Sequence, residues 1–190
     1  MIFDWVVSLL VASMIALTLV VLGMGAVQAM DRNAGVGNML EAVVTSVSTH
    51  VNRDEGLSAA TSERFSYGPA PVPGGNGSVL PVNADGYLYQ WIVTPDFLMA
   101  SADLPGGSTS RTSSFDNPLH LYSPATVQTL ALAGYQTTQA QLQSWDQSSP
   151  CIAFPSGVDI QVSVVLVWVD ASPTYLTIFY PVGYTPSACP

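Results

Sequence analysis

Two cysteines are the residues of this chain whose chemistry says most. Cys151 and Cys189 lie 38 positions apart (189 − 151) near the C-terminal end, no CxxC pair is present, and no histidine is close to either. Cysteine metal sites need clustered thiolates or histidines at short spacing. The sequence therefore favours a disulfide between the two, formed in an oxidising compartment. Two unrelated buried thiols are the alternative.

The other reactive side chains form no catalytic or binding motif. His50 and His120 are the only histidines, and neither has a serine motif or an acidic sequence neighbour that indicates nucleophilic catalysis. Asp96, Asp103 and Asp116 lack the alternating spacing of a calcium loop. We expect no enzyme activity, no cofactor and no metal site, so function has to be inferred from architecture.

The charge composition excludes one class of partner. The chain has thirteen acidic residues, four arginines and no lysine, which gives a net charge of −9. Nucleic-acid binding needs clustered cations, so no nucleic acid is expected, and electrostatic attachment to anionic lipid is also disfavoured. Ser, Thr, Gln, Asn and Gly must cover the surface, as is common on extracellular filaments.

The element that dominates the sequence is the stretch from Trp5 to Met30, which contains no charged residue. About 20 apolar residues span a bilayer as a helix. The segment before it, Met1 to Asp4, has no basic residue, unlike a secretory signal. The nearest cations follow the stretch, and the positive-inside rule alone therefore places the following domain in the cytoplasm. That location conflicts with the expected disulfide, which needs an oxidising compartment. A basic leader removed ahead of Met1 resolves this conflict and makes Met1 the mature N-terminus.

The helix is expected to continue with an amphipathic part. After Gly35 and Gly37, Asn38 can cap a restart and Gly56 can end it, which predicts one helix of about 50 residues or two collinear ones. The expected domains are 1–55 (apolar 1–30, amphipathic 31–55) and 56–190. The predicted buried stripe is Met39, Leu40, Val43, Val44, Val47 and Val51, whereas Glu41, Thr45, Ser48, Thr49 and Asn52 are predicted to face away.

The rest of the chain is predicted to be a loop-rich β domain with a C-terminal disulfide region. Strands are predicted at 87–93, 158–169 and 175–182, with a turn at 170–173. Short helices are predicted at 125–133 and 137–145, and loops at 57–86 and 101–118. The continuous apolar second half of 158–169 suggests cover on both faces. The expected fold class is α+β, with a long N-terminal apolar and amphipathic helix packed on an antiparallel β-sheet domain.

This order of elements resembles a bacterial type IV pilin, of the b class or a minor pilin or pseudopilin. The likeness is one of architecture: an apolar helix from the first residue, an amphipathic continuation to about Arg53, a loop, a sheet and a late cysteine pair. After leader removal, pilins of the b class can begin with methionine, and Met1 matches this feature. The family places a glutamate just behind the new N-terminus, to pair with a neighbouring subunit's N-terminal amine. Asp4 stands one position earlier here, and the resemblance implies that Met1 and Asp4 act in assembly.

The expected function is a structural subunit of an extracellular type IV pilus-like filament, assembled through the apolar helix. The partners are then identical subunits in a helical homo-oligomer. The expected location is the inner membrane before assembly and the cell surface afterwards. Two alternatives stay open: a membrane-anchored exported domain for adhesion or envelope organisation, and a virion membrane or coat protein.

Overall fold

The computed structural model describes residues 2–55, 61–67, 79–122, 124–130, 135–148 and 150–189. The chain divides into two compact units, Met1–Gly35 and Val36–Pro190. Helix α1 (Ile2–Glu55) contributes to both units. The fold class is α+β, as predicted, with an N-terminal helix and mainly antiparallel sheets.

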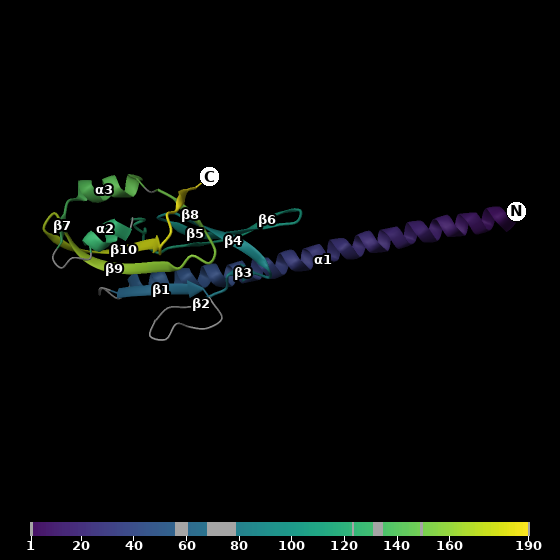
Figure 1. The fold of residues 1–190 in the computed structure, drawn as a ribbon, viewed down its shortest axis with the longest axis horizontal. Helices are drawn as coiled ribbons and strands as arrows, with labels where there is room; N and C mark the ends of the chain where they lie inside the picture. The colour runs from purple at the N-terminus through teal and green to yellow at the C-terminus, as the bar shows by residue number, and fades with distance from the viewer. Residues whose placement is uncertain are drawn as a thin grey trace. The chain divides into compact units, whose positions relative to one another are not determined.

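The described strands of the second unit form two sheets (Figure 1). One has the order β10-β9-β1-β2, with β7 paired to β9, and the other has the order β11-β8-β4-β5-β6, with β3 paired to β4. Among the described strands, the pairs β1–β2 and β7–β9 are parallel and the other pairs are antiparallel. The strands are β1 Thr61–Tyr67, β2 Val79–Leu80, β3 Asn83–Ala84, β4 Tyr87–Val93, β5 Phe97–Leu104, β6 Gly107–Ser114, β7 Gln136–Thr137, β8 Ile152–Pro155, β9 Ile160–Val169, β10 Ser172–Pro181 and β11 Ser187–Ala188. The short helices are α2 Pro124–Leu130 and α3 Gln139–Ser148.

The part of α1 from Val36 onward belongs to the main hydrophobic core. Its apolar side chains form one stripe that packs with residues of both sheets, including Phe65, Trp91 and Phe154. All of the predicted stripe is buried except Met39, which is 37% exposed. The buried members on α1 are Val36, Leu40, Val43, Val44, Val47 and Val51. Packing of this face stabilises the helix far more than intrinsic propensity does.

The helix runs through Gly35 and Gly37 without a break, so of the two expected arrangements the single long helix is found and the restart at Asn38 is not. A Cβ on Gly37 would lie 2.6 Å from Nη2 of Arg111. The glycine therefore leaves room for the guanidinium, whose Nε lies 3.4 Å from Oε2 of Glu41. The sequence pattern could not separate a helix-breaking glycine from one that admits a neighbouring side chain.

The polar side of α1 is not wholly exposed, contrary to expectation. Ser48, predicted to face away, is 3% exposed and shares a hydrogen bond with Ser113 of β6, Oγ to Oγ 2.9 Å. Farther along the helix, the Asp116 backbone N–H donates to Oδ1 of Asn52. These two hydrogen bonds join the polar side of α1 to β6 and to the residues that follow β6.

Strand β9 is buried on opposite faces in its two halves. Ile160 and Val162 point into the core that contains α1. Because strand side chains alternate, the odd-numbered Val167 and Val169 point the other way, into a second core with Leu130 of α2, Leu142 of α3 and residues of β10. The second half of β9 is covered on that face only, because Leu166 and Trp168 on the opposite face are 38% and 39% exposed, so the predicted cover on both faces of this half is wrong.

Two predicted loops contain strands. The loop predicted at 101–118 includes the β5–β6 hairpin, and the one at 57–86 includes β1, β2 and β3. Ser and Thr fit an edge strand without a hydrophobic signal, so composition alone was misleading in β6. Pro105 and Gly106 (φ 105°) make the hairpin turn, with glycine at the position that needs positive φ.

The β9–β10 hairpin closes more tightly than predicted. Its turn is only Asp170 and Ala171, both at positive φ (47° and 66°), which is the geometry of a two-residue type I′ turn. Ser172 and Pro173, predicted as turn, already belong to β10. Strand β4 has the predicted bounds, whereas α2 begins one residue before its predicted start and α3 differs from its predicted range at both ends. Residues 131–133, the last three of the first predicted helix, lie outside the described residues.

Candidate functional site

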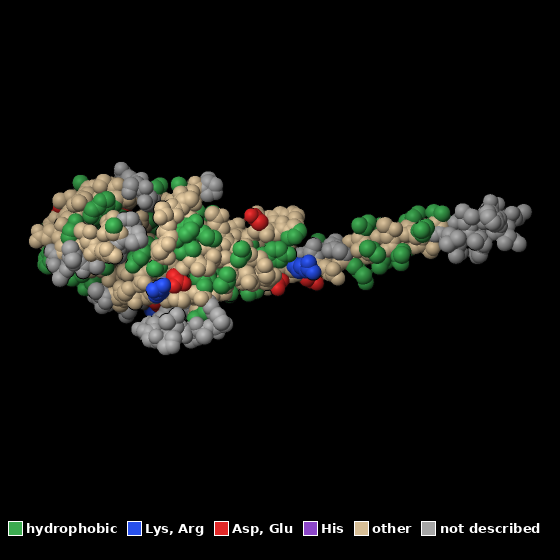
Figure 2. Space-filling view, viewed as in Figure 1, with side chains coloured by type: hydrophobic (Ala, Val, Ile, Leu, Met, Phe, Trp, Pro, Cys, Tyr) green, Lys and Arg blue, Asp and Glu red, His purple; other side chains and the backbone are tan. Residues whose placement is uncertain are grey.

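Hydrophobic side chains lie along the described part of the first unit on the face that Figure 2 shows. Leu19, Val20, Val21 and Leu22 are consecutive, and four consecutive residues of an α-helix point in all directions. We call residues 11–30 the apolar segment. Its large apolar side chains, which range from 51% exposed (Val11) to 71% (Met30), are Val11, Met14, Ile15, Leu17, Leu19, Val20, Val21, Leu22, Met24 and Met30.

This segment is adapted to burial in apolar surroundings. Full burial of one large aliphatic side chain is worth roughly 1.5–3 kcal/mol, and a helix that is hydrophobic all round is normally a buried one. The hydroxyl of Thr18 donates to the backbone carbonyl of Met14 at 2.8 Å, so this polar group is satisfied within the helix itself. The segment can therefore enter an apolar environment without leaving that donor unpaired.

The two residues predicted to act in assembly, Met1 and Asp4, belong to the N-terminal end of the chain. Asp4 lies in the first turn of α1, but its side chain is not among those described. Met1 lies outside the described residues. Across the residues that are described, no helix meets the length and hydropathy needed to cross a membrane.

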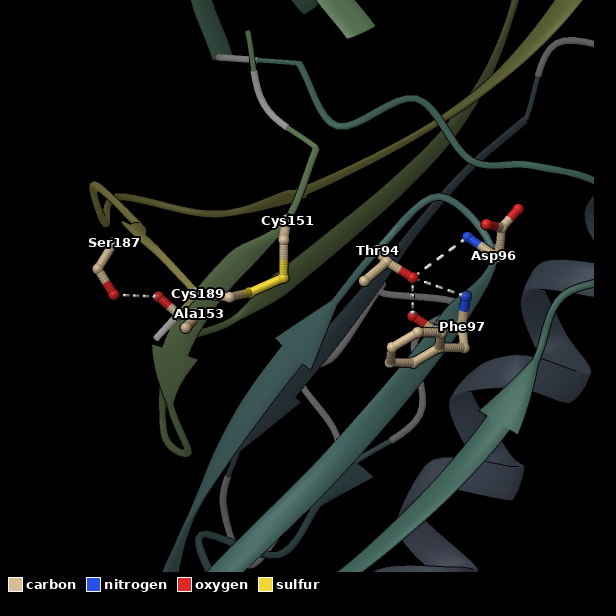
Figure 3. The surroundings of a disulfide bond; sticks show 7 residues. All are labelled: Thr94, Asp96, Phe97, Cys151, Ala153, Ser187 and Cys189. Atoms are coloured by element: carbon tan, nitrogen blue, oxygen red, sulfur yellow. Dashed lines mark hydrogen bonds between the residues drawn. A yellow bond between two sulfur atoms is a disulfide. The ribbon is translucent and has the colours of Figure 1, made fainter. Parts of the chain in front are cut away.

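The two cysteines lie at disulfide distance, as the sequence analysis expects. Figure 3 shows the bond between Cys151, just before β8, and Cys189, just after β11. Their Cα atoms are 5.6 Å apart, within the usual range for a disulfide. Beside it, the hydroxyl of Ser187 donates to the carbonyl of Ala153 at 3.3 Å. The bond and the short β11–β8 pairing together hold the C-terminal segment on the edge of the six-stranded sheet.

Both histidines have acidic partners that the sequence did not reveal. Nδ1 of His50 lies 2.9 Å from Oε1 of Glu63, whose side chain is 6% exposed. The other oxygen of Glu63 lies 3.4 Å from Nη2 of Arg53. Because Glu63 comes from β1 and the other two from α1, this ion-pair cluster joins the helix to the sheet. The guanidinium of Arg53 compensates part of the charge that is buried on Glu63.

The second histidine ties α3 to the segment after β6. Nδ1 of His120 lies 2.9 Å from Oδ1 of Asp146 and 3.0 Å from the hydroxyl of Tyr122. Burial, reinforced by the negative charge of Asp146, raises the pKa of Tyr122. The Tyr122 ring also makes an edge contact with Trp145. The cluster fastens α3 over the second core, and the described residues include no group of three acidic, His or Cys side chains able to hold a metal ion.

A shallow groove of about 390 Å³ lies on the face of the six-stranded sheet. Its lining includes outward side chains of β4 and β5 on one side and the C-terminal segment held by the disulfide on the other. The lining side chains used below are Leu88, Gln90, Ser101, Asp103, Tyr184 and Ser187. Sequence reasoning missed the groove because it placed 101–118 in a loop. The Pro105-Gly106 turn signal could have revealed the β5–β6 hairpin, of which β5 contributes to the floor of the groove.

Comparison with known proteins gives no further constraint on function. No protein-family model, curated protein or solved structure matches this chain. The strongest functional signal is thus the exposed apolar segment, and the groove is a separate feature of the second unit.

Proposed function

We propose that the chain is a structural subunit of an extracellular, type IV pilus-like filament, assembled through the apolar segment. The observation that carries this proposal is the exposure of apolar side chains on all sides of residues 11–30, with values of 51–71%. A single flat partner covers one side of a helix, whereas a bundle of neighbouring helices covers all sides. Copies of the same segment supply such a bundle without any other protein.

The second unit suits the exterior of such a filament. It is an α+β domain with its own hydrophobic core, and the C-terminal segment is fastened by the disulfide. The absence of lysine and the net charge of −9 fit a soluble, Ser/Thr-rich exterior. The pilin-like arrangement, with the amphipathic part of α1 packed on sheet, is the finer part of the proposal.

The proposal includes an inner-membrane stage before assembly. The stretch from Trp5 to Met30 contains no charged residue, so lipid can cover it until neighbouring subunits do. A domain that stays anchored in lipid is the competing outcome. The two differ in one respect: only the filament buries the apolar segment in lipid-free material.

Electron microscopy of material sheared from cells that express the chain tests the proposal. We expect filaments that are labelled by an antibody against the second unit and that contain the chain by mass spectrometry. If the chain is found only in membrane vesicles, the filament proposal is wrong and the anchored domain is the better account.

Asp4 offers a sharper variant of the same experiment. It is the only carboxylate before Asp31, and a carboxylate carried into a helix bundle needs a positive partner. We expect Asp4→Asn to reduce filament number sharply while the second unit stays folded, and Asp4→Glu to be tolerated. Asp31→Asn is the matched control, because Asp31 is exposed at the other end of the segment. Equal filament numbers in Asp4→Asn and wild-type cells would exclude an assembly role for Asp4.

A further inference from the structure

We propose that the groove between the C-terminal segment and strands β4 and β5 binds a neutral oligosaccharide. The groove lies wholly within the second unit, so this inference holds whether the domain sits on a filament or alone. Its volume of about 390 Å³ falls within the range of small-molecule sites. Three features of the groove favour such a ligand: polar groups on the floor, apolar groups at the sides and no cation among the described lining residues.

The floor carries closely spaced hydrogen-bonding groups. Gln90 of β4 and Ser101 of β5 are direct cross-strand partners, and Asp103 follows Ser101 on the same face, two residues and about 7 Å along the strand. Within the described part of the chain, neither Gln90 nor Asp103 hydrogen-bonds another side chain. An amide, a hydroxyl and a carboxylate together offer both donors and acceptors to neighbouring hydroxyl groups of a sugar ring.

Apolar surface stands beside these polar groups. Leu88, two residues before Gln90 on the same strand face, is 70% exposed, and Tyr184 on the C-terminal segment is 38% exposed. A sugar ring has an apolar face of C–H groups and a polar rim of hydroxyls. A groove that combines an aromatic ring and an aliphatic side chain with planar polar groups is complementary to both.

The charge of the lining excludes anionic ligands. None of the described residues that line the groove is Lys, Arg or His, and Asp103 is the single charged side chain among them. Phosphorylated or acidic sugars would be repelled by Asp103 and gain no compensating cation. A peptide that adds as a strand is also disfavoured, because β11 already pairs with β8 at Ile152 and Ala153.

The disulfide also contributes to the proposed sugar binding, because it holds one side of the groove in place. Tyr184 and Ser187 form one wall of the groove, and Cys189 anchors the segment that carries them to Cys151. Chain-closing bonds of this kind keep a binding wall in place before the ligand arrives, which reduces the entropy lost on binding. Loss of the bond should therefore weaken binding even where the domain core stays folded.

Saturation-transfer NMR on the full chain tests the proposal. The chain is kept in a zwitterionic detergent, because a detergent with a sugar head group would compete for the groove. The probes are maltotriose, cellotriose and tri-N-acetylchitotriose, with sialyllactose as the anionic comparison and spermine as the cationic one. We expect at least one neutral trisaccharide to bind and sialyllactose to bind less well than its uncharged counterpart, lactose.

Variants identify the groove as the binding site. Gln90→Ala and Asp103→Ala should each weaken binding about tenfold, the usual effect of losing a hydrogen bond to a ligand. Tyr184→Ala should weaken it as well, whereas Gln143→Ala, an exposed glutamine on α3, should have no effect. The double variant Cys151→Ser, Cys189→Ser should bind more weakly than wild type, and near-ultraviolet circular dichroism checks that each variant is folded.

Three results would overturn the proposal. The first is that none of the three neutral trisaccharides binds. The second is that Gln90→Ala and Asp103→Ala bind as tightly as wild type, which moves the site elsewhere. The third is that spermine displaces the bound sugar or binds alone through Asp103, which makes the groove a cation site.

Discussion

The two parts of α1 have the same backbone geometry but opposite surroundings. Leu17, in the first unit, is 68% exposed, whereas Leu40, in the second, is 0% exposed. Large apolar residues occupy all sides of the helix before Met30 and one stripe of it after Val36. The second part is thus a core element of the second unit, whereas no described residue of this chain buries the large apolar side chains of the first part, which is the condition that the proposed filament requires.

Glycines in the two parts give the same contrast. Gly37 is explained by its own domain, because Arg111 occupies the space where a Cβ would stand. Gly23 has no described atom within 4 Å of the corresponding position. A glycine costs a helix about 1 kcal/mol relative to alanine. Nothing among the described residues offsets that cost at Gly23, as expected if the offsetting contact is intermolecular.

The largest expected effect comes from the same substitution made in both parts of the helix. Leu40→Ala should lower the free energy of unfolding of the second unit by about 2–5 kcal/mol, because it leaves a cavity in the core. Leu17→Ala should change it by less than about 0.5 kcal/mol, since the side chain is exposed. Urea unfolding of the full chain in detergent, followed by tryptophan fluorescence, measures both. Equal losses would show that the apolar segment is part of the domain core.

The disulfide should have the next largest effect, confined to the second unit. A bond between residues 38 positions apart contributes on the order of 3–4 kcal/mol in the chain-entropy model. Guanidinium unfolding with and without reductant measures this difference by near-ultraviolet circular dichroism. Intact mass after alkylation of the denatured, unreduced chain tests the bond itself. Two alkylated thiols in natively isolated protein would refute it.

Tyr67 should respond both to mutation and to pH. Its hydroxyl accepts a hydrogen bond from the indole N–H of Trp91, which is fully buried, at 2.6 Å. Tyr67→Phe should cost about 1–3 kcal/mol because that N–H loses its acceptor. Tyr175→Phe, at a 45% exposed position, is the control with no expected loss.

The pH dependence follows from burial of the same phenol. Burial raises the pKa of Tyr67 above its ordinary value of 10.0. The folded state therefore holds this proton more tightly than the unfolded state, so the associated stability is complete below about pH 10 and is lost as the pH rises further. Urea unfolding across this range should show a smaller alkaline loss in Tyr67→Phe than in wild type. An identical loss in both would assign the effect to other groups.

The smallest effect is expected at the β9–β10 turn. Ala171 has a φ of 66°, a backbone conformation that is strained for a residue with a Cβ but not for glycine. Ala171→Gly should raise the free energy of unfolding by about 0.5–1 kcal/mol after the entropy of the unfolded chain is counted. Thermal unfolding measures the change. A loss of stability would mean that the alanine methyl makes a contact worth more than the strain.

Sequence patterns were reliable wherever hydrophobic period and position agreed. The stripe from Leu40 to Val51 is predicted from its helical period, and the strand Tyr87–Val93 from its aromatic and β-branched residues. The hairpin at 97–114 was missed because Ser and Thr give an edge strand no hydrophobic period. The pairs His50–Glu63 and His120–Asp146 were missed because they join residues that are 13 and 26 positions apart and meet only through the fold.

The central claim is that other copies of the chain bury the apolar segment outside any membrane. Peroxide oxidation of methionines, read by peptide mass spectrometry on sheared, lipid-free and detergent-free surface material, tests it most directly. In the single chain Met14 and Met24 are 70% and 64% exposed, whereas Met39 is 37% exposed. The account predicts that this material contains the chain in polymeric form and that Met14 and Met24 resist oxidation more than Met39 does. Oxidation of Met14 and Met24 at least as fast as that of Met39, or the absence of the chain from lipid-free polymer, would contradict it.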